Sequence, residues 1–223
     1  PSVERLVEDR RIPLISYTGS SAVGRDVGAR VARRFGHSLL ELSGNNAVLI
    51  DASANLDLAI PAVVFGFVGT AGQRCTSTRR VLVHESRYEE FQRRLLDAVS
   101  QIRIGDPLAA ETLMGPLIDA EAVAAYLAAI AEVQGLGGKV LAGGELLKRP
   151  GNFVTPTVVS ARNEWSVVQR ETFGPLLYLM KVQDLHEAIS LQNAVPQGLS
   201  SSLFTESLHS AEMFLAASGS DCG

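Results

Sequence analysis

Short apolar runs separated by longer amphipathic segments dominate the pattern of the chain. The short runs predict buried strands. They occur at 12–17, 38–42, 46–51, 79–84, 139–142 and 176–182. Segments with a helical period lie at 22–35, 57–69, 86–102, 119–134, 185–193 and 208–217. Strands that alternate with helices predict an α/β fold, and the strand–helix–strand order of the first segments favours a parallel sheet.

Turn and capping residues mark the ends of two predicted helices. Gly36 follows the first helical segment and predicts its end, because glycine readily adopts the left-handed conformation of a helix C-terminus. Ser86, followed by Glu89, has the spacing of a capping box and predicts that a helix begins there.

Two prolines bear on the predicted buried elements. The apolar segment at 57–69 predicts a buried helix, in which Pro61 marks a kink or a late start. Pro156 lies within the extended segment 151–159 and predicts an edge or irregular strand, since proline cannot donate a hydrogen bond to a sheet ladder.

Composition and charge narrow the class of protein. The 223 residues are 46% hydrophobic and 20% charged, which is typical of a globular domain. The net charge is −4 and no block of basic residues occurs, so nucleic acid is not an expected partner. No run of about 18 apolar residues predicts a membrane span.

The two cysteines, Cys75 and Cys222, are too few for a disulfide framework, and neither belongs to a CxxC or Cys/His cluster. We therefore expect no metal site, and we expect a reducing cytoplasm as the location. Cys222 is expected to be a structural residue. The chain begins without Met, and its two ends suggest a fragment of a longer protein.

A turn between the first predicted strand and helix is a candidate phosphate site. Gly19 and Ser20 precede the helical segment, and the free backbone N–H groups of a helix N-terminus attract anions. The spacing of Gly19, Gly24 and Gly28 fits neither the GxGxxG fingerprint nor a P-loop. An ordinary capped turn is therefore the alternative.

Cys75 is the first candidate for catalytic chemistry. Gly69 and Gly72 precede it and leave room for backbone or ligand. The adjacent Arg74 carries a permanent positive charge that favours the thiolate form of cysteine. An inert, buried cysteine is the alternative, because free cysteine is among the most buried residue types.

Glu41 is the second candidate, because a carboxylate interrupts an apolar strand just before a small-residue turn. A buried carboxylate at that place is suited to act as a general base. A glutamate at the strand end that faces water is the alternative. Arg79 and Arg80 are expected to be surface or ion-pair residues.

Three short motifs resemble the signatures of the NAD(P)-dependent aldehyde dehydrogenase superfamily. They occur in the order and at about the spacing of that family, and Tyr17–Ser20 is similar to its cofactor-side turn. The motifs are Leu40–Asn46, Gly72–Thr76 and Glu171–Pro175. The double Asn45–Asn46 and the tail Gly219–Gly223 look most like the antiquitin branch, which is associated with α-aminoadipic semialdehyde.

The resemblance implies roles for the residues that match its motifs. Cys75 would be the nucleophile, and its backbone N–H would donate to the oxyanion. Glu41 would be the general base that hydrolyses the thioester, which favours the non-acylating class. Arg74 would anchor a carboxylate-bearing aldehyde, with a structural hydrogen bonder as the alternative. Five residues would bind NAD, with NADP not excluded: Gly19, Ser20, Leu42, Glu171 and Phe173.

The resemblance also implies a domain division and an assembly. Residues 1–43 would end a Rossmann-like NAD-binding domain with its last βαβ unit. Residues 44–223 would form a C-terminally truncated catalytic domain, an α/β fold with a doubly wound, mostly parallel sheet. The parent enzyme would be a homo-oligomer, a dimer or a tetramer. Ser43 stands where the family usually has Gly, and its side chain could crowd the nicotinamide end. The isolated chain could instead be silent, or act only as a Cys-dependent esterase.

Overall fold

The structure is a computed structural model that describes residues 2–220. The chain forms two compact units, Pro1–Ser43 and Gly44–Gly223. Each unit has its own cluster of buried apolar side chains. That the two units are a cofactor-binding and a catalytic domain stays a prediction.

The smaller unit is a βαβ unit preceded by a short helix. It contains α1 (Ser2–Glu8), β1 (Leu14–Thr18), α2 (Ser21–Arg33) and β2 (His37–Glu41). The two strands pair in parallel, with Leu14 opposite His37, so the predicted strand–helix–strand order is confirmed. Val7 of α1 packs with Val27 and Val31 of α2, and these three side chains form the core of the unit.

The end of α2 differs from the prediction. Arg34 is the C-cap, and Phe35, not Gly36, adopts the left-handed conformation, with φ 60°. The N–H groups of Phe35 and Gly36 donate to the carbonyls of Ala32 and Val31 in the last turn. Phe35 thus holds a backbone conformation that glycine adopts at lower cost, and its side chain is exposed.

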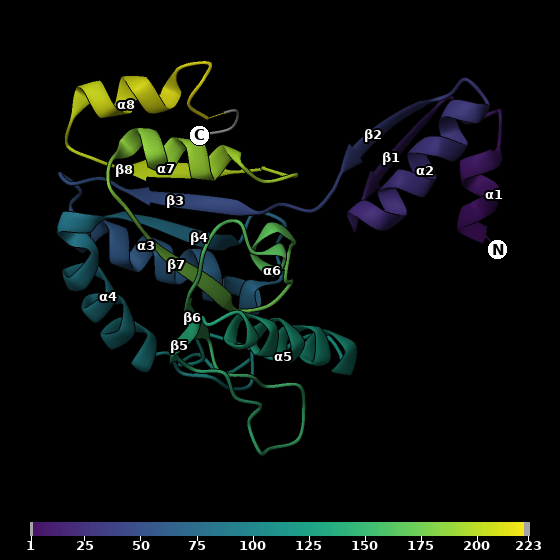
Figure 1. Ribbon diagram of the computed structural model, residues 1–223. Helices are drawn as coiled ribbons and strands as arrows, with labels where there is room; N and C mark the ends of the chain where they lie inside the picture. The colour runs from purple at the N-terminus through teal and green to yellow at the C-terminus, as the bar shows by residue number, and fades with distance from the viewer. Residues whose placement is uncertain (1, 221–223) are drawn as a thin grey trace. The chain divides into compact units, whose positions relative to one another are not determined.

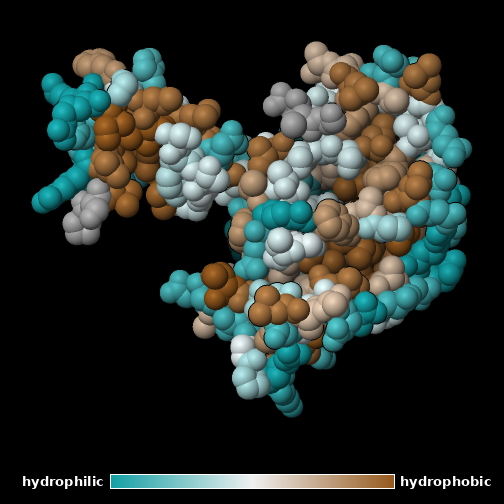
Figure 2. Space-filling view, turned by 180° about the vertical axis from the view of Figure 1, so that it is seen from behind, coloured by the Kyte–Doolittle hydropathy of each residue, from teal (hydrophilic) through white to brown (hydrophobic). Residues whose placement is uncertain are grey.

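Exposed apolar side chains gather on the smaller unit (Figure 2). They include Leu14 and Leu39, at 54% exposure each, one from each strand of the two-stranded sheet. A two-stranded sheet with one helix layer covers only one of its faces, so the opposite face keeps its apolar side chains in contact with solvent.

The larger unit is built on a six-stranded sheet (Figure 1). Its strands are β3 (Asn46–Ile50), β4 (Thr78–His84), β5 (Lys139–Ala142), β6 (Thr157–Ser160), β7 (Leu176–Val182) and β8 (Ser201–Phe204). The order across the sheet is β5-β6-β7-β4-β3-β8. All neighbouring pairs are parallel except β5 with β6. The predicted α/β fold with a mostly parallel sheet is confirmed.

Helices cover both faces of this sheet, as expected for a doubly wound fold. They are α3 (Leu56–Val68), the 3-10 helix η1 (Gly69–Gly72), α4 (Glu85–Ser100), α5 (Ala120–Gly135), α6 (Ser166–Gln169), α7 (Leu185–Asn193) and α8 (Leu208–Leu215). In Figure 1, α7 and α8 lie on one side of the sheet, and α3 and α4 lie on the other. The central strands β3, β4 and β7 are buried almost throughout, so the core lies on both sides of them.

Predictions about two helices are wrong in part. The helix α3 begins at Leu56 and continues across Pro61, so a late start is wrong, whereas a kink at Pro61 stays a prediction. The helix is also not buried all round, because Leu58 and Phe65 are 65% and 67% exposed. The helix α4 begins at Glu85, one residue before the predicted cap, because the His84 side chain accepts a hydrogen bond from the Ser86 N–H. A histidine ring nitrogen thus replaces the serine hydroxyl as the cap.

Two predictions about strands are wrong in part. Pro156 precedes β6, an internal strand between β5 and β7, so proline does not mark an edge here, but the pairing of β6 with β5 is irregular, which is the other half of that prediction. Arg79 and Arg80, expected at the surface or in ion pairs, are both 1% exposed. Arg79 does make an ion pair, whereas Arg80 is satisfied by neutral acceptors.

Candidate active site

Three segments that lie far apart in the sequence meet at Gly44, just before β3. The Gly44 N–H donates to Oε1 of Glu171 at 3.3 Å. On its other side, a Cβ added to Gly44 would lie 2.5 Å from the Cys75 carbonyl oxygen. Any side chain at this position would therefore push the Cys75 loop away. Two of the predicted site residues, Cys75 and Glu171, are brought to one place by this contact.

The turn that leads into Cys75 is strained. Thr70, Ala71 and Gly72 all have left-handed backbone conformations, with φ of 54°, 52° and 70°. This conformation costs roughly 1–2 kcal/mol for a residue with a Cβ. Strain of this kind persists only where the surroundings hold it, and it occurs most often at functional sites.

The Gln73 side chain holds the strained turn from one side. Its Nε2 donates to the Thr70 carbonyl at 3.1 Å and to the Pro116 carbonyl at 3.3 Å. Its Oε1 accepts from the Ile118 N–H at 2.9 Å. The turn is thus tied to the loop that precedes α5.

Asn46, the first residue of β3, holds the loop on the other side of Cys75. Its side-chain amide donates to the carbonyls of Cys75 and Ser77, both at 2.7 Å. Its Oδ1 accepts from the Ser200 N–H at 2.9 Å. Asn46 is 3% exposed, and its bond to the Ser77 carbonyl is buried, whereas its bonds to Cys75 and Ser200 are partly buried.

Arg79, in β4, lies beneath the same loop with 1% of its surface exposed. Its guanidinium donates to the carbonyls of Gly72 at 2.7 Å, Arg74 at 3.0 Å and Gly174 at 3.1 Å. Its Nη2 also lies 3.6 Å from Oε1 of Glu171. Burial lowers the pKa of Arg79, and the negative charge of Glu171 opposes that shift.

Phe173 stands over the guanidinium of Arg79. The distance from the Arg79 Cζ to the ring centroid is 5.5 Å, which is within cation–π range. Phe173 remains 44% exposed, so part of its surface is open to a partner. Glu171 and Phe173 therefore both contact Arg79, which brings the two predicted cofactor residues of this unit together. Their role in binding a cofactor stays a prediction.

Cys75 itself is partly buried, between the exposed Thr76 and the buried β4. Arg74, the predicted substrate anchor, turns toward α3, where its Nη2 donates to the Phe65 carbonyl at 3.4 Å. Its guanidinium also lies 5.1 Å from the centroid of the Phe65 ring. These contacts fit the alternative given above, in which Arg74 is a structural hydrogen bonder. The role of Arg74 as substrate anchor stays a prediction.

The other predicted residues lie in the smaller unit. Gly19 follows β1, and its N–H donates to the Glu41 carbonyl at 3.0 Å. Ser20 caps α2, since its hydroxyl accepts from the Val23 N–H at 3.3 Å. Leu42 packs against Gly24 of α2. Glu41 ends β2 and is exposed within this chain. The roles of these residues in catalysis and cofactor binding stay predictions.

Ser43 makes a contact that a glycine could not. Its hydroxyl accepts a hydrogen bond at 3.4 Å from the N–H of Ser21, which is the first residue of α2. The amides at this helix N-terminus are those expected to attract phosphate. A side chain at position 43 therefore occupies one of these donors.

The supporting residues Asn46, Gln73 and Arg79 were not predicted as such from the sequence. One signal was present, because Arg79 and Arg80 interrupt an otherwise apolar strand. Successive strand residues point to opposite faces of a sheet, so one of the two had to point toward the loop before β4. Cys222 lies outside the described residues.

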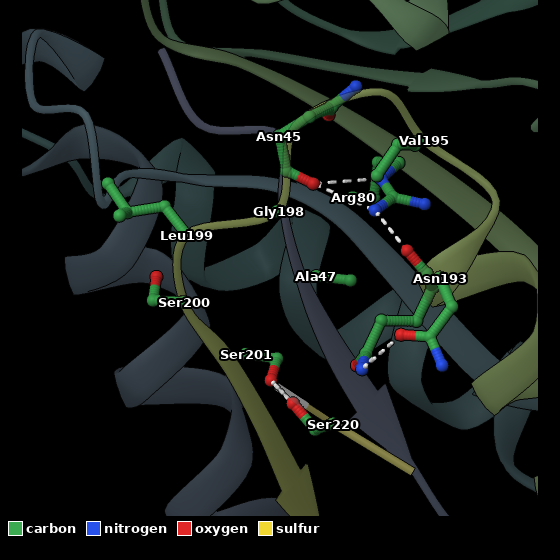
Figure 3. A pocket seen from close by; sticks show the side chains of 11 residues that line it. Asn45, Ala47, Arg80, Asn193, Val195, Gly198, Leu199, Ser200, Ser201 and Ser220 are labelled. Atoms are coloured by element: carbon green, nitrogen blue, oxygen red, sulfur yellow. Dashed lines mark hydrogen bonds between the residues drawn. The ribbon is translucent and has the colours of Figure 1, made fainter. Parts of the chain in front are cut away.

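A cavity of about 370 Å³ lies beside Arg80 and does not include Cys75 or Glu171 (Figure 3). It is lined by polar groups of Asn45, Gln192, Ser200 and Ser220 among others. Within residues 2–220, no group of three or more His, Cys, Asp or Glu is placed to hold a metal ion. In the same part of the chain, no helix combines the length and the apolar character that a membrane crossing requires.

Solved structures of dehydrogenases have the same fold. Betaine aldehyde dehydrogenase of Staphylococcus aureus, in complex with NAD⁺, matches 94% of this chain and 43% of its own, with a TM-score of 0.91 and 28% identity. A 3,6-anhydro-L-galactose dehydrogenase matches 99% of this chain and 47% of its own, with a TM-score of 0.95 and 30% identity.

Curated relatives are similar over nearly all of the chain. It is 48% identical to aldehyde dehydrogenase family 7 member A1 of Pisum sativum, over 98% of this chain and 43% of the relative. It is 46% identical to α-aminoadipic semialdehyde dehydrogenase of Mus musculus, over 98% of this chain and 41% of the relative. The chain thus spans about two fifths of the length of these relatives.

The sequence model of the aldehyde dehydrogenase family matches residues 2–223. The match covers all three motifs that meet at Gly44, and the expected resemblance, including its antiquitin branch, is confirmed. The chain belongs to the aldehyde dehydrogenase family.

Proposed function

We propose that the whole protein, at the length of its relatives, oxidises an aldehyde to a carboxylic acid with NAD or NADP. The convergence of Cys75 and Glu171 at Gly44 carries this proposal, because it brings the backbone of a cysteine and a carboxylate to opposite sides of one glycine. The names of the mouse and bovine relatives favour a semialdehyde that carries a carboxylate.

The residues of this chain fit a nicotinamide cofactor. The Glu171 carboxylate is held in place by the Gly44 N–H and by Arg79, and a carboxylate so held can accept hydrogen bonds from ribose hydroxyls. The exposed part of the Phe173 side chain suits contact with an aromatic ring. Gly19 and Ser20, at the start of α2, suit a pyrophosphate. The cofactor, when bound, accepts hydride from the substrate carbon.

The proposed chemistry begins at Cys75. Its thiolate attacks the aldehyde carbon, a C–S bond forms, and the carbonyl oxygen becomes an oxyanion. The backbone N–H of Cys75 donates to that oxygen. Loss of hydride from the same carbon leaves a thioester on Cys75. Glu41 then takes a proton from water, which attacks the thioester carbonyl and releases the carboxylic acid and the thiolate.

The Cys75→Ser variant of the whole protein tests this proposal, with α-aminoadipic semialdehyde and NAD⁺ as substrates. We expect NADH formation in the unsubstituted protein and none above background in the variant. Cys222→Ser is the matched control and should keep the activity. The proposal would be wrong if the unsubstituted protein formed no NADH, or if Cys222→Ser, and not Cys75→Ser, abolished it.

Arg74 is a proposed anchor for the substrate carboxylate. The observation in its favour is that its Nε is buried and has no partner within the described part of the chain. An Arg74→Lys variant should raise the KM for the semialdehyde and leave the KM for an uncharged aldehyde unchanged. A KM that rises equally for both aldehydes would assign Arg74 a structural role.

The assembly and the location are further proposals. We propose a homo-oligomer, a dimer or a tetramer, because apolar side chains such as Leu58 and Phe65 on α3 are exposed in the single chain. Light scattering of the whole protein tests this. We propose a cytoplasmic location, because the sequence has no disulfide framework. Fractionation of cells that produce the tagged protein tests that location.

A further inference from the structure

Arg79 lies outside the three signature motifs, so the motifs do not account for its contacts. Its buried guanidinium touches three loop carbonyls, a carboxylate and an aromatic ring. Arg80, its neighbour in β4, points to the other face of the sheet and bonds Asn45, Asn163, Leu191 and Gln192, but neither the Cys75 loop nor Glu171. Arg79 is thus the one of this pair placed to act on the nucleophile.

The bond from Arg79 to the Arg74 carbonyl fixes the direction of the next N–H. The Arg74 carbonyl and the Cys75 N–H belong to one peptide, and no cis peptide occurs among the described residues. In a planar trans peptide the C=O and the N–H point in opposite directions. The carbonyl accepts from Arg79 Nη2 and from the Ser77 N–H, both at 3.0 Å, so it faces β4. The Cys75 N–H therefore faces away from β4.

The Cys75 N–H donates to no protein group within residues 2–220. Arg74, the residue before it, and Ser77, two residues after it, both use their N–H groups inside the loop. A donor held outward next to the thiol is what a developing oxyanion requires.

We propose that Arg79 is a positioning residue that holds the Cys75 peptide as an oxyanion donor. The inference rests on the proposed function, since the oxyanion forms when Cys75 attacks a carbonyl. Arg79 does not touch the substrate in this account. It acts through the Arg74 carbonyl, and its ion pair with Glu171 keeps the guanidinium in place.

Lysine cannot replace arginine in this role. It carries the same charge and can pair with Glu171, but it has a single nitrogen and cannot bond the carbonyls of Gly72, Arg74 and Gly174 with the same fork of donors. An Arg79→Lys variant thus keeps the buried charge and loses the geometry.

Two reactions at Cys75 distinguish a loss of oxyanion positioning from general damage to the site. Hydrolysis of p-nitrophenyl acetate passes through an oxyanion and needs no nicotinamide cofactor. Alkylation by iodoacetamide forms a bond from sulfur to carbon, releases iodide and forms no oxyanion. We expect Arg79→Lys in the whole protein to slow ester hydrolysis by about 10- to 100-fold and to leave the alkylation rate at Cys75 nearly unchanged.

Arg80→Lys is the matched control. Arg80 is equally buried and donates to the Asn45, Leu191 and Gln192 carbonyls on the far side of the strand, next to the cavity (Figure 3). Its substitution should lower thermal stability to a similar extent and leave the ratio of ester hydrolysis to alkylation at the unsubstituted value. Arg79→Gln, which removes the buried charge, is the second variant if Arg79→Lys does not fold, and it should show the same selective loss.

The inference would be overturned if ester hydrolysis and alkylation fell together in the Arg79 variants, or if Arg80→Lys lowered the ratio equally. Failure of the proposed function would give a different result. In that case the unsubstituted protein would hydrolyse the ester and form no NADH from aldehydes. The ratio of ester hydrolysis to alkylation would still fall in the Arg79 variants and not in Arg80→Lys.

Discussion

The side-chain amide of Asn46 donates to the Cys75 carbonyl at 2.7 Å, so the first residue of β3 holds the backbone of the proposed nucleophile. The same amide bonds the Ser77 carbonyl, and its oxygen accepts from Ser200. One buried side chain thus joins β3, the Cys75 loop and the segment that enters β8.

An Asn46→Asp substitution should strongly destabilise the larger unit. The carboxylate has nearly the same shape as the amide, but it would face two carbonyl oxygens without a proton to donate. We expect the free energy of unfolding to fall by about 3 kcal/mol or more. Urea titration followed by circular dichroism measures this change.

Asn193→Asp is the control for that prediction. Asn193 is exposed, and its amide donates to the Gly219 carbonyl at 2.8 Å, so water can replace the lost donor. We expect a loss of about 1 kcal/mol or less. Equal losses in the two variants would show that burial of the Asn46 amide does not matter.

Gly72 is predicted to tolerate no side chain. Its φ of 70° is left-handed, and a Cβ there would lie 2.2 Å from the Gly174 carbonyl oxygen. A Gly72→Ala variant should therefore lose more stability than the roughly 1–2 kcal/mol of left-handed strain. Gly137→Ala is the matched comparison, since Gly137 has φ 91° and no atom within 4 Å of the added Cβ. Urea titrations that give the same loss for both would refute the close contact at Gly72.

The arrangement of strands and helices could be predicted from the sequence because apolar periodicity is a local property. The strands β3, β4 and β7 are apolar runs, and the βαβ order of the first 43 residues follows from them. The prediction placed the left-handed residue at the end of α2 at Gly36, whereas Phe35 adopts that conformation in a Schellman-type helix end. The preference for glycine at this position is too weak to exclude another residue there.

The supports of the site could not be predicted from the sequence in the same way. Cys75 was a candidate from its neighbouring residues, and Glu171 was found through the family pattern. Arg79 is separated from Glu171 by 92 positions in the sequence, and only the pairing of β4 with β7 brings the two together. No local pattern states which carbonyls a buried arginine will bond.

Glu41→Gln should separate the two halves of the proposed reaction. In the whole protein we expect about one NADH per site to form in a burst, because thiol attack and hydride transfer do not need the base. The steady-state rate should then fall about 100-fold or more, because the amide cannot take a proton from water. Stopped-flow absorbance measures both phases, and hydroxylamine, which cleaves thioesters directly, should restore turnover. A variant with an unchanged steady-state rate would remove Glu41 from the base role.

Two buried tyrosines predict a loss of stability at alkaline pH. Burial raises the pKa of Tyr126 and of Tyr178 from 10.0 to about 12. Their hydroxyls are bonded inside the larger unit, to the Thr155 carbonyl at 2.6 Å and to the Val167 carbonyl at 3.2 Å. Since the unfolded chain ionises its tyrosines first, their contribution is fully present below pH 10 and is lost as pH rises from 10 to 12.

At pH 11 an unfolded tyrosine is mostly ionised while the folded one is mostly neutral, so each group costs about 1.4 kcal/mol. We expect the free energy of unfolding, measured by urea titration at pH 8 and at pH 11, to fall by about 3 kcal/mol from these two groups together. The double variant Tyr126→Phe, Tyr178→Phe has no phenol to ionise, so its loss between the same pH values should be smaller by that amount. If both proteins lost the same stability, the alkaline sensitivity would arise from other groups, and the two phenols would not be held neutral by burial.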